Sequence, residues 1–253
     1  MSNLLFKYLF STTDYNNGNG TTLNDTSEND DDATLHSSTG STNSFSNNTG
    51  WVTNDSPFSA NLIGTGLYGG SPYSVTTRSN DTSGKYRHFK HTLSADDTLT
   101  NHSFTICIWG KGTDSSPEKH SSIFASSETN DFTTFQIGFK NINGSSTWCV
   151  LCETSNTNKS IFPINVYTQN QWAHIAVTYL YDSTLSNRVL KTYFNGSLTN
   201  TYTSSSASGN ALLSANTFII ERYIIGTNRN ENNAFHGKVL LFARSGTASW
   251  CPM

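Results

Sequence analysis

Two short stretches in the second half of the chain decide its fold. Residues 171–179 read QWAHIAVTY, and residues 191–196 read KTYFNG. In the second stretch, Asn195-Gly196 can adopt the two positive φ angles of a type I′ turn, and β-capable residues 197–202 follow it. In the first, every second residue is suited to burial on one side of an extended chain: Ala173, Ile175, Val177 and Tyr179. The sequence therefore predicts a buried strand followed by a tight antiparallel hairpin.

The same stretches carry a family signature. W-x-H followed by a hydrophobic residue and A-V-T-Y at 172–179, together with Y-hydrophobic-N-G at 193–196, resembles the laminin G-like branch of the concanavalin A-like lectin/glucanase superfamily. F-T-I-x-x-W-x-K at 104–111 and the hydrophobic endings at 217–226 and 234–244 extend this resemblance. It implies an all-β fold, an antiparallel two-sheet β-sandwich of the concanavalin A-like jelly-roll type. In that fold the first strand pairs with the last.

The composition agrees with many short strands joined by polar turns. Only 13% of the 253 residues are charged, and no repeat or charged linker divides the chain. We expect residues 1–253 to form a single domain. It would include an irregular excursion, or a few short edge strands, at about 36–62, and an unassigned C-terminal tail at 245–253. Other expected strands lie at about 3–10, 103–111, 122–125, 135–139, 147–151, 217–226 and 234–244.

Charge and hydropathy exclude two classes of partner. The net charge of −3 argues against a protein that binds by neutralising phosphates or anionic lipids. A basic and aromatic run at 85–91 is better explained as a strand with charged outward residues than as a nucleic-acid patch, because its basic residues fall on both faces. No stretch approaches the ~20 apolar residues of a spanning helix. We expect neither a nucleic-acid partner nor insertion into a membrane.

An acidic segment at 25–35 resembles the calcium-binding loop of the family. In that loop an Asp, an Asn and main-chain carbonyls hold the ion, and a hard cation needs six to eight such oxygen ligands. The resemblance implies Asp25, Asn29 and Asp31 as metal ligands and calcium as the cofactor.

Other residues leave a second interpretation of this segment open. Glu28 and Ala33 stand where the family has glycines, and Leu240 and Leu241 replace an acidic pair that completes the calcium shell in the family. The acidic run is then a solvated turn between strands.

The sequence shows no catalytic constellation. The superfamily includes glucanases, whose two catalytic carboxylates alternate along one strand, and that spacing does not occur here. His174 occupies a position typical of the family's non-enzymatic members, so we interpret it as a structural, hydrogen-bonded histidine rather than a catalytic base. The four cysteines, among them a C-x-x-C at 149–152, are too scattered for a disulfide framework or a zinc site, and we interpret them as free thiols. We expect that the protein is not an enzyme.

Two function classes remain, a binding module and a structural module that assembles with copies of itself as a homo-oligomer or with other proteins of a larger particle. Sugar binding would use exposed aromatic rings with amide and hydroxyl partners. By residue type alone, the candidates are Trp51, Tyr68, Tyr73, Trp148 and Tyr181.

The start of the chain bears on where the protein acts. It begins at Met1 without an export signal and has neutral, Asn/Ser/Thr-rich loops. These features favour a phage or viral particle surface protein, a capsid decoration or fibre component that meets host glycans. The alternative is a secreted or cell-surface carbohydrate-binding lectin or adhesion domain, with an extracellular location.

Overall fold

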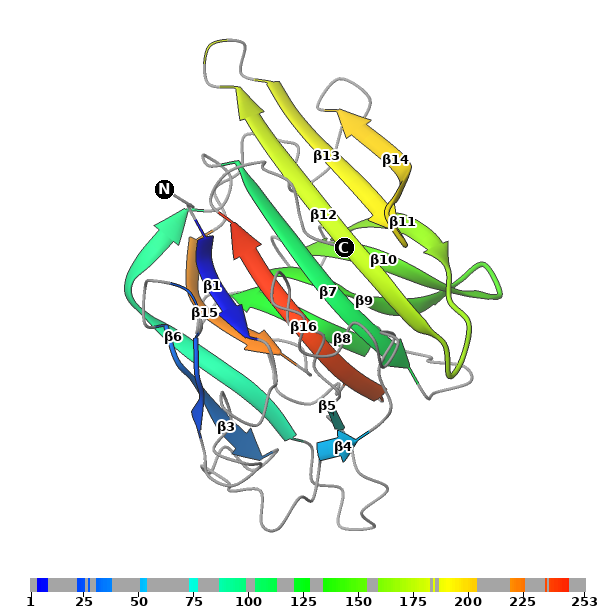
Figure 1. Ribbon diagram of the computed structural model, residues 1–253. Helices are drawn as coiled ribbons and strands as arrows, with labels where there is room; N and C mark the ends of the chain where they lie inside the picture. Colours follow the sequence, from blue (N-terminus) through cyan, green and yellow to red (C-terminus); the bar gives the residue numbers. More distant parts are fainter. Residues whose placement is uncertain are drawn as a thin grey trace.

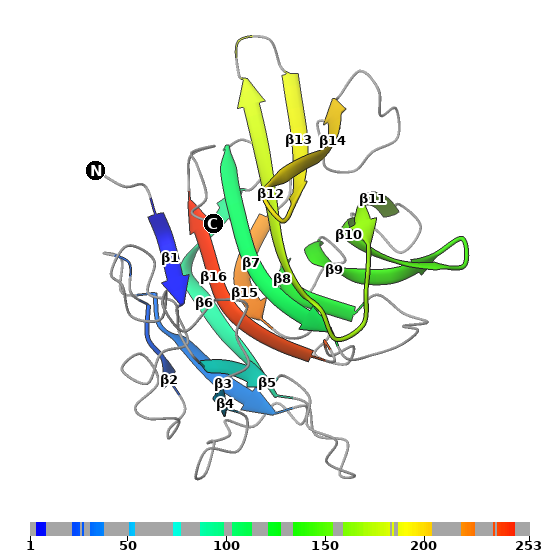
Figure 2. The same cartoon turned by 45° about the vertical axis from the view of Figure 1, so that its right-hand side comes forward.

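Two eight-stranded sheets make up the described part of the protein (Figures 1 and 2). The computed structural model describes residues 4–8, 22–25, 27, 31–37, 51–53, 73–76, 87–98, 103–112, 121–127, 134–153, 159–182, 184, 187–203, 219–225, 235 and 237–245. Sheet I has the strand order β14-β13-β12-β7-β16-β5-β4, with β1 paired to β16, and sheet II has the order β11-β10-β9-β8-β15-β6-β3-β2.

The strands of sheet I are β1 (Leu4–Tyr8), β4 (Trp51–Thr53), β5 (Tyr73–Thr76), β7 (Phe104–Gly112), β12 (Trp172–Asp182), β13 (Asn187–Phe194), β14 (Ser197–Thr203) and β16 (Gly237–Ser245). Those of sheet II are β2 (Thr22–Leu23), β3 (Ala33–Ser37), β6 (Arg87–Thr98), β8 (Ser121–Ser127), β9 (Thr134–Ile142), β10 (Ser145–Glu153), β11 (Lys159–Val166) and β15 (Ile219–Ile225).

The predicted all-β jelly roll is confirmed. Every pairing in the two sheets is antiparallel, and the first strand, β1, pairs with the last, β16. Figure 1 shows β7, β12 and β16 of sheet I in front of β8, β9 and β10 of sheet II. Among the described residues, no helix has the length and apolar character needed to cross a membrane.

The structure describes parts of three segments whose structure the sequence did not define closely. In the excursion at 36–62 the described residues include the short strand β4, which lies at the edge of sheet I. The basic run at 85–91 leads into β6, as its interpretation as a strand predicts. The tail at 245–253 lies outside the described residues apart from Ser245, the end of β16.

The core lies between the sheets and consists of alternate residues of the strands. The four predicted residues of β12 are all buried, with Ile175 and Val177 fully so. Phe104 of β7 stacks on Tyr179 with ring centroids 5.2 Å apart. Burial of each such side chain stabilises the fold by roughly 1.5–3 kcal/mol. The largest fully buried side chains are Trp148, Tyr179, Phe104, Phe124 and Phe135.

The second face of β12 is also buried, which the alternating pattern did not predict. His174 is 2% exposed and Ala176 is 5% exposed. Their partners across the ladder to β7 are Trp109 and Cys107, and the rings of Trp109 and His174 lie 5.0 Å apart. Burial lowers the pKa of His174 to about 4, because the charged imidazolium loses its hydration.

A pair of hydrogen bonds joins the β13–β14 turn to His174. The Asn195 backbone N–H donates to the His174 carbonyl at 2.8 Å, and the His174 backbone N–H donates to Asn195 Oδ1 at 2.9 Å. The turn has the predicted positive φ angles, 48° at Asn195 and 80° at Gly196. The expectation of a hydrogen-bonded His174 therefore holds for its backbone but is wrong for its ring, which has no hydrogen-bond partner among the described residues.

The turn residue predicts a measurable stability effect. Asn195→Ala removes the acceptor of the His174 N–H and places an alanine at φ 48°, so we expect a loss of about 1–2 kcal/mol in the free energy of unfolding. Asn195→Asp keeps both the acceptor and the tolerance of a positive φ and should stay within about 0.5 kcal/mol of wild type. Urea titration of the three proteins tests this. Equal stability of the Ala and wild-type proteins would contradict it.

The buried imidazole predicts a pH dependence. Because the pKa of His174 is about 4 in the folded protein and about 6.5 in an unfolded chain, the unfolded state takes up a proton first as the pH falls. The contribution of the neutral His174 to the free energy of unfolding is therefore fully present above pH 6.5. As the pH falls from 6.5 to 4, the free energy of unfolding declines by up to ~3 kcal/mol. His174→Phe should remove this part of the decline, as followed by thermal melts at several pH values. An unchanged pH profile in the variant would rule out the contribution.

Candidate functional site

A pocket of about 250 Å³ opens at one end of the sandwich, where β11 and the loop after it face the start of β12 and the β13–β14 turn. We call it the rim pocket. Its apolar lining consists of Trp148, Val166, Trp172, Ala173 and Phe194. Its polar lining consists of Asn165, Thr168, Gln171 and Asn195. None of these side chains is charged.

The loop that forms one wall of the rim pocket is held by backbone hydrogen bonds. Tyr167 N–H donates to the Ser146 carbonyl at 2.9 Å, and Asn170 N–H donates to the Gly112 carbonyl at 2.8 Å. The Tyr167 ring stacks on Phe139 with centroids 4.2 Å apart, and a side chain on Gly112 would collide with that ring. The wall is therefore formed before any ligand arrives.

Two amide side chains in the rim pocket are fixed in orientation. Asn195 Oδ1 accepts the His174 N–H at 2.9 Å, and Asn165 Oδ1 accepts the Val166 N–H at 2.8 Å. Since the oxygen of each amide is the acceptor, the amino group of each must point the other way. No described residue accepts a hydrogen bond from either Nδ2 group, so both donors remain available to a ligand.

The aromatic candidates from the sequence divide between several places. Trp148 lines the rim pocket but is only 1% exposed, so it forms a wall and not an open stacking platform. Tyr181 packs against the Arg188 guanidinium, which lies 5.0 Å from the ring centroid. Trp51 and Tyr73 lie on β4 and β5, whose side chains are outside the described residues, as is the whole of Tyr68. Trp172, which the sequence reasoning missed as a binding residue, also lines the pocket.

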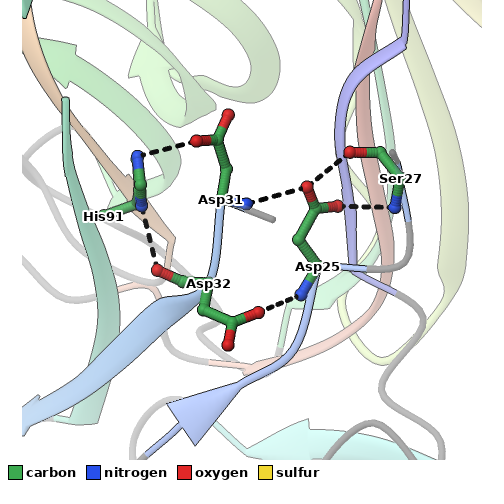
Figure 3. Close-up of polar contacts among 5 residues, drawn as sticks. All are labelled: Asp25, Ser27, Asp31, Asp32 and His91. Carbon is green, nitrogen blue, oxygen red and sulfur yellow. Dashed lines mark hydrogen bonds and ion pairs between the residues drawn. The ribbon is translucent and has the colours of Figure 1, made fainter. Parts of the chain in front are cut away.

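The acidic segment forms a hydrogen-bonded loop between β2 and β3 (Figure 3). The Asp25 carboxylate accepts the Ser27 N–H at 2.8 Å, the Asp31 N–H at 3.1 Å and the Ser27 hydroxyl. Asp32 Oδ1 accepts the Asp25 N–H at 2.7 Å. His91 of β6 lies 3.5 Å from Asp31 Oδ1 through Nε2 and 2.9 Å from the Asp32 carbonyl through Nδ1.

These contacts bear on the predicted calcium site. The structure brings Asp25 and Asp31 together, whereas Asn29 lies outside the described residues. The Asp25 oxygens already accept hydrogen bonds from their own loop, and within the described ranges no group of three or more His, Cys, Asp or Glu could hold a metal ion. As arranged, the described donor set does not form the six- to eight-oxygen shell that calcium needs, and calcium binding stays a prediction.

The cysteines correct one expectation. Cys107 is disulfide-bonded, so the interpretation of all four cysteines as free thiols is wrong. Strand pairing brings sequence-distant residues together, and sequence spacing does not show which ones. Cys149 and Cys152 are free, as expected, and both are buried. Burial raises the pKa of Cys149 to about 12 and that of Cys152 well above its usual value, so both stay protonated and unsuited to redox or metal chemistry.

Comparison with known proteins places the chain in a family. The family model of the concanavalin A-like lectin/glucanases superfamily matches residues 83–243. No curated protein matches the sequence.

Solved structures of low sequence identity share the fold. The botulinum neurotoxin serotype G binding domain aligns with a TM-score of 0.54 and 12% identity, covering 96% of this chain and 48% of that one. A second structure, of the botulinum neurotoxin type G receptor binding domain, aligns with a TM-score of 0.53 and 12% identity, covering 97% and 48%. This chain thus spans about half the length of these structures. The family match, the paired sheets and the W-x-H strand agree, and the protein belongs to the concanavalin A-like lectin/glucanase superfamily.

Proposed function

We propose that this protein is a non-enzymatic, glycan-binding jelly-roll module whose binding site is the rim pocket. The observation that carries the proposal is the chemistry of the pocket, which combines aromatic walls with amide donors of fixed orientation. Sugars have apolar C–H faces and many hydroxyl groups, and sites of this kind bind them by packing and by a few directed hydrogen bonds. Membership of a lectin/glucanase superfamily supports the same class of ligand.

The surroundings of the pocket support binding without catalysis. A glycosidase needs two carboxylates, one on either side of the scissile bond, and none of the described residues that line the rim pocket is an Asp or a Glu. His174 is buried and neutral at physiological pH, with its ring against Trp109, so it has no access to a substrate in the pocket. The pocket can hold a sugar, but its described residues offer no group to cleave one.

The place of action is an outer surface, in our proposal that of a phage or viral particle, where the module would contact host glycans. The disulfide at Cys107 supports an oxidising location. The alternative is a secreted or cell-surface lectin or adhesion domain, and the disulfide at Cys107 agrees equally well with that location. Mass spectrometry of purified particles and of the secreted fraction separates the two locations.

Sugar binding at the rim pocket is tested with a glycan array. We expect binding to a subset of glycans, and Trp172→Ala should weaken it roughly fivefold or more, through loss of ~1 kcal/mol of aromatic packing. Leu198→Ala is the matched control, because this exposed apolar residue does not line the pocket and its loss should leave affinity unchanged. A flat array, or equal effects of the two substitutions, would remove the proposal.

The proposed binding needs no cation. The donors in the rim pocket are neutral amides, and β11 beside the pocket and β2 beside the acidic loop lie at opposite edges of sheet II. We expect chelation by EDTA to leave glycan affinity unchanged. The calcium site predicted at Asp25 and Asp31 is tested separately, by comparing melting temperatures in millimolar calcium and in the same concentration of magnesium. Since a ligand that binds the folded state raises its stability, a rise specific to calcium would establish the site, and equal melting temperatures would remove it.

A further inference from the structure

We infer that the rim pocket recognises the acetamido group of an N-acetylated sugar. This inference rests on the proposed glycan binding and adds to it the chemical class of the ligand. It follows from three properties of the pocket: the absence of charge among its described lining residues, the two oriented donors, and the apolar walls beside them.

The lack of charge on the described lining residues limits which ligand groups can enter the pocket. All described residues that line the rim pocket are neutral. A carboxylate, sulfate or phosphate that enters such a site gives up its hydration without gaining a cationic partner, which is costly. A protonated amine meets the same penalty. The part of the ligand that enters is therefore uncharged.

The two fixed amides define what the uncharged group must offer. Asn165 and Asn195 each use Oδ1 for a backbone N–H of the protein, at 2.8 and 2.9 Å, and present Nδ2 as a donor. A hydroxyl group can satisfy such donors, but an amide carbonyl is a pure acceptor with two lone pairs and can accept from both. The preferred ligand group is thus an amide carbonyl.

The walls and the volume of the pocket also suit the acetyl methyl, the acetamido N–H and the sugar ring. Val166, which is 61% exposed, and the half-buried Trp172 provide apolar surface against which the acetyl methyl can pack. Thr168 and Gln171 are exposed side chains at the mouth and offer oxygen acceptors for the acetamido N–H. A pocket of about 250 Å³ lies just below the ~300–1,000 Å³ of usual ligand sites, which suits one sugar ring and not a longer stretch of glycan.

The first experiment compares monosaccharides by saturation-transfer NMR and calorimetry on the intact chain. N-acetylglucosamine and N-acetylgalactosamine should bind about tenfold or more tightly than glucose, galactose, glucosamine or glucuronic acid, because the acetamido carbonyl can accept from both amide donors while its methyl group packs on the apolar wall. Equal binding of glucose and N-acetylglucosamine would overturn the acetamido inference and leave the glycan proposal intact. Absence of binding by every saccharide, here and on the array, would overturn both.

Substitutions locate the recognition. Asn165→Asp and Asn195→Asp keep the oxygen that the backbone N–H requires but replace the amino donor with a second, repelling oxygen. We expect each to weaken N-acetylglucosamine binding by about tenfold or more while the melting temperature stays close to that of wild type. Asn141→Asp is the matched control, since Asn141 Oδ1 accepts the Gly144 N–H at 2.9 Å in the β9–β10 hairpin, outside the pocket. Wild-type affinity in both pocket variants, or an equal loss in the control, would contradict the assignment.

Discussion

The paired hydrogen bonds between Asn195 and His174 connect the fold of this protein to its binding site. They extend the β12–β13 ladder by one residue beyond Phe194 and hold the β13–β14 turn against the first residues of β12. The same contact uses the oxygen of the Asn195 amide and leaves the amino group of this pocket-lining residue as a free donor. One turn residue therefore sets the register of the hairpin and the polarity of the site.

A second set of contacts joins the edges of the two sheets. The edge strands β11 and β14 belong to different sheets and are joined by two hydrogen bonds to one carbonyl, since Asn200 Nδ2 and the Tyr202 hydroxyl both donate to the Pro163 carbonyl, at 3.0 and 2.8 Å. Proline lacks the N–H of an inner strand residue and suits an edge position next to a register shift, as found here between Trp148 and Cys149 of β10. These contacts hold β14 of sheet I against β11, the strand of sheet II that carries Asn165 and Val166 of the pocket.

The fold was predictable because its signals are local. Alternation in β12 and the Asn-Gly turn are properties of neighbouring residues, and the β13–β14 hairpin adopts the predicted positive φ angles at Asn195-Gly196. Burial of the second face at His174 and Ala176 was not predictable, because a period of two assigns side chains to faces but does not say what covers each face. The disulfide at Cys107 was missed for a related reason, since its formation depends on long-range geometry.

The candidate site was predicted only in part. Trp148 could be named by residue type, whereas the roles of Asn165, Asn195 and Trp172 depend on how β11, β12 and the β13–β14 turn converge. The Y-hydrophobic-N-G motif contains Asn195, but the motif predicted only a turn and not a hydrogen-bond donor for a ligand. The acidic segment was predicted to bind calcium because of its carboxylates and its resemblance to the family's loop. The described carboxylates of Asp25 and Asp32 instead accept hydrogen bonds from backbone N–H groups of the same loop.

The central claim is that the rim pocket, with its oriented amides, is where a sugar binds. It is tested most directly by two-dimensional ¹H–¹⁵N NMR of the assigned protein during titration with N-acetylglucosamine. We predict that the side-chain amide signals of Asn165 and Asn195 and the indole signal of Trp172 shift together with one dissociation constant, while signals of Asp25 and His91 stay in place. Shifts confined to other parts of the protein would contradict the account.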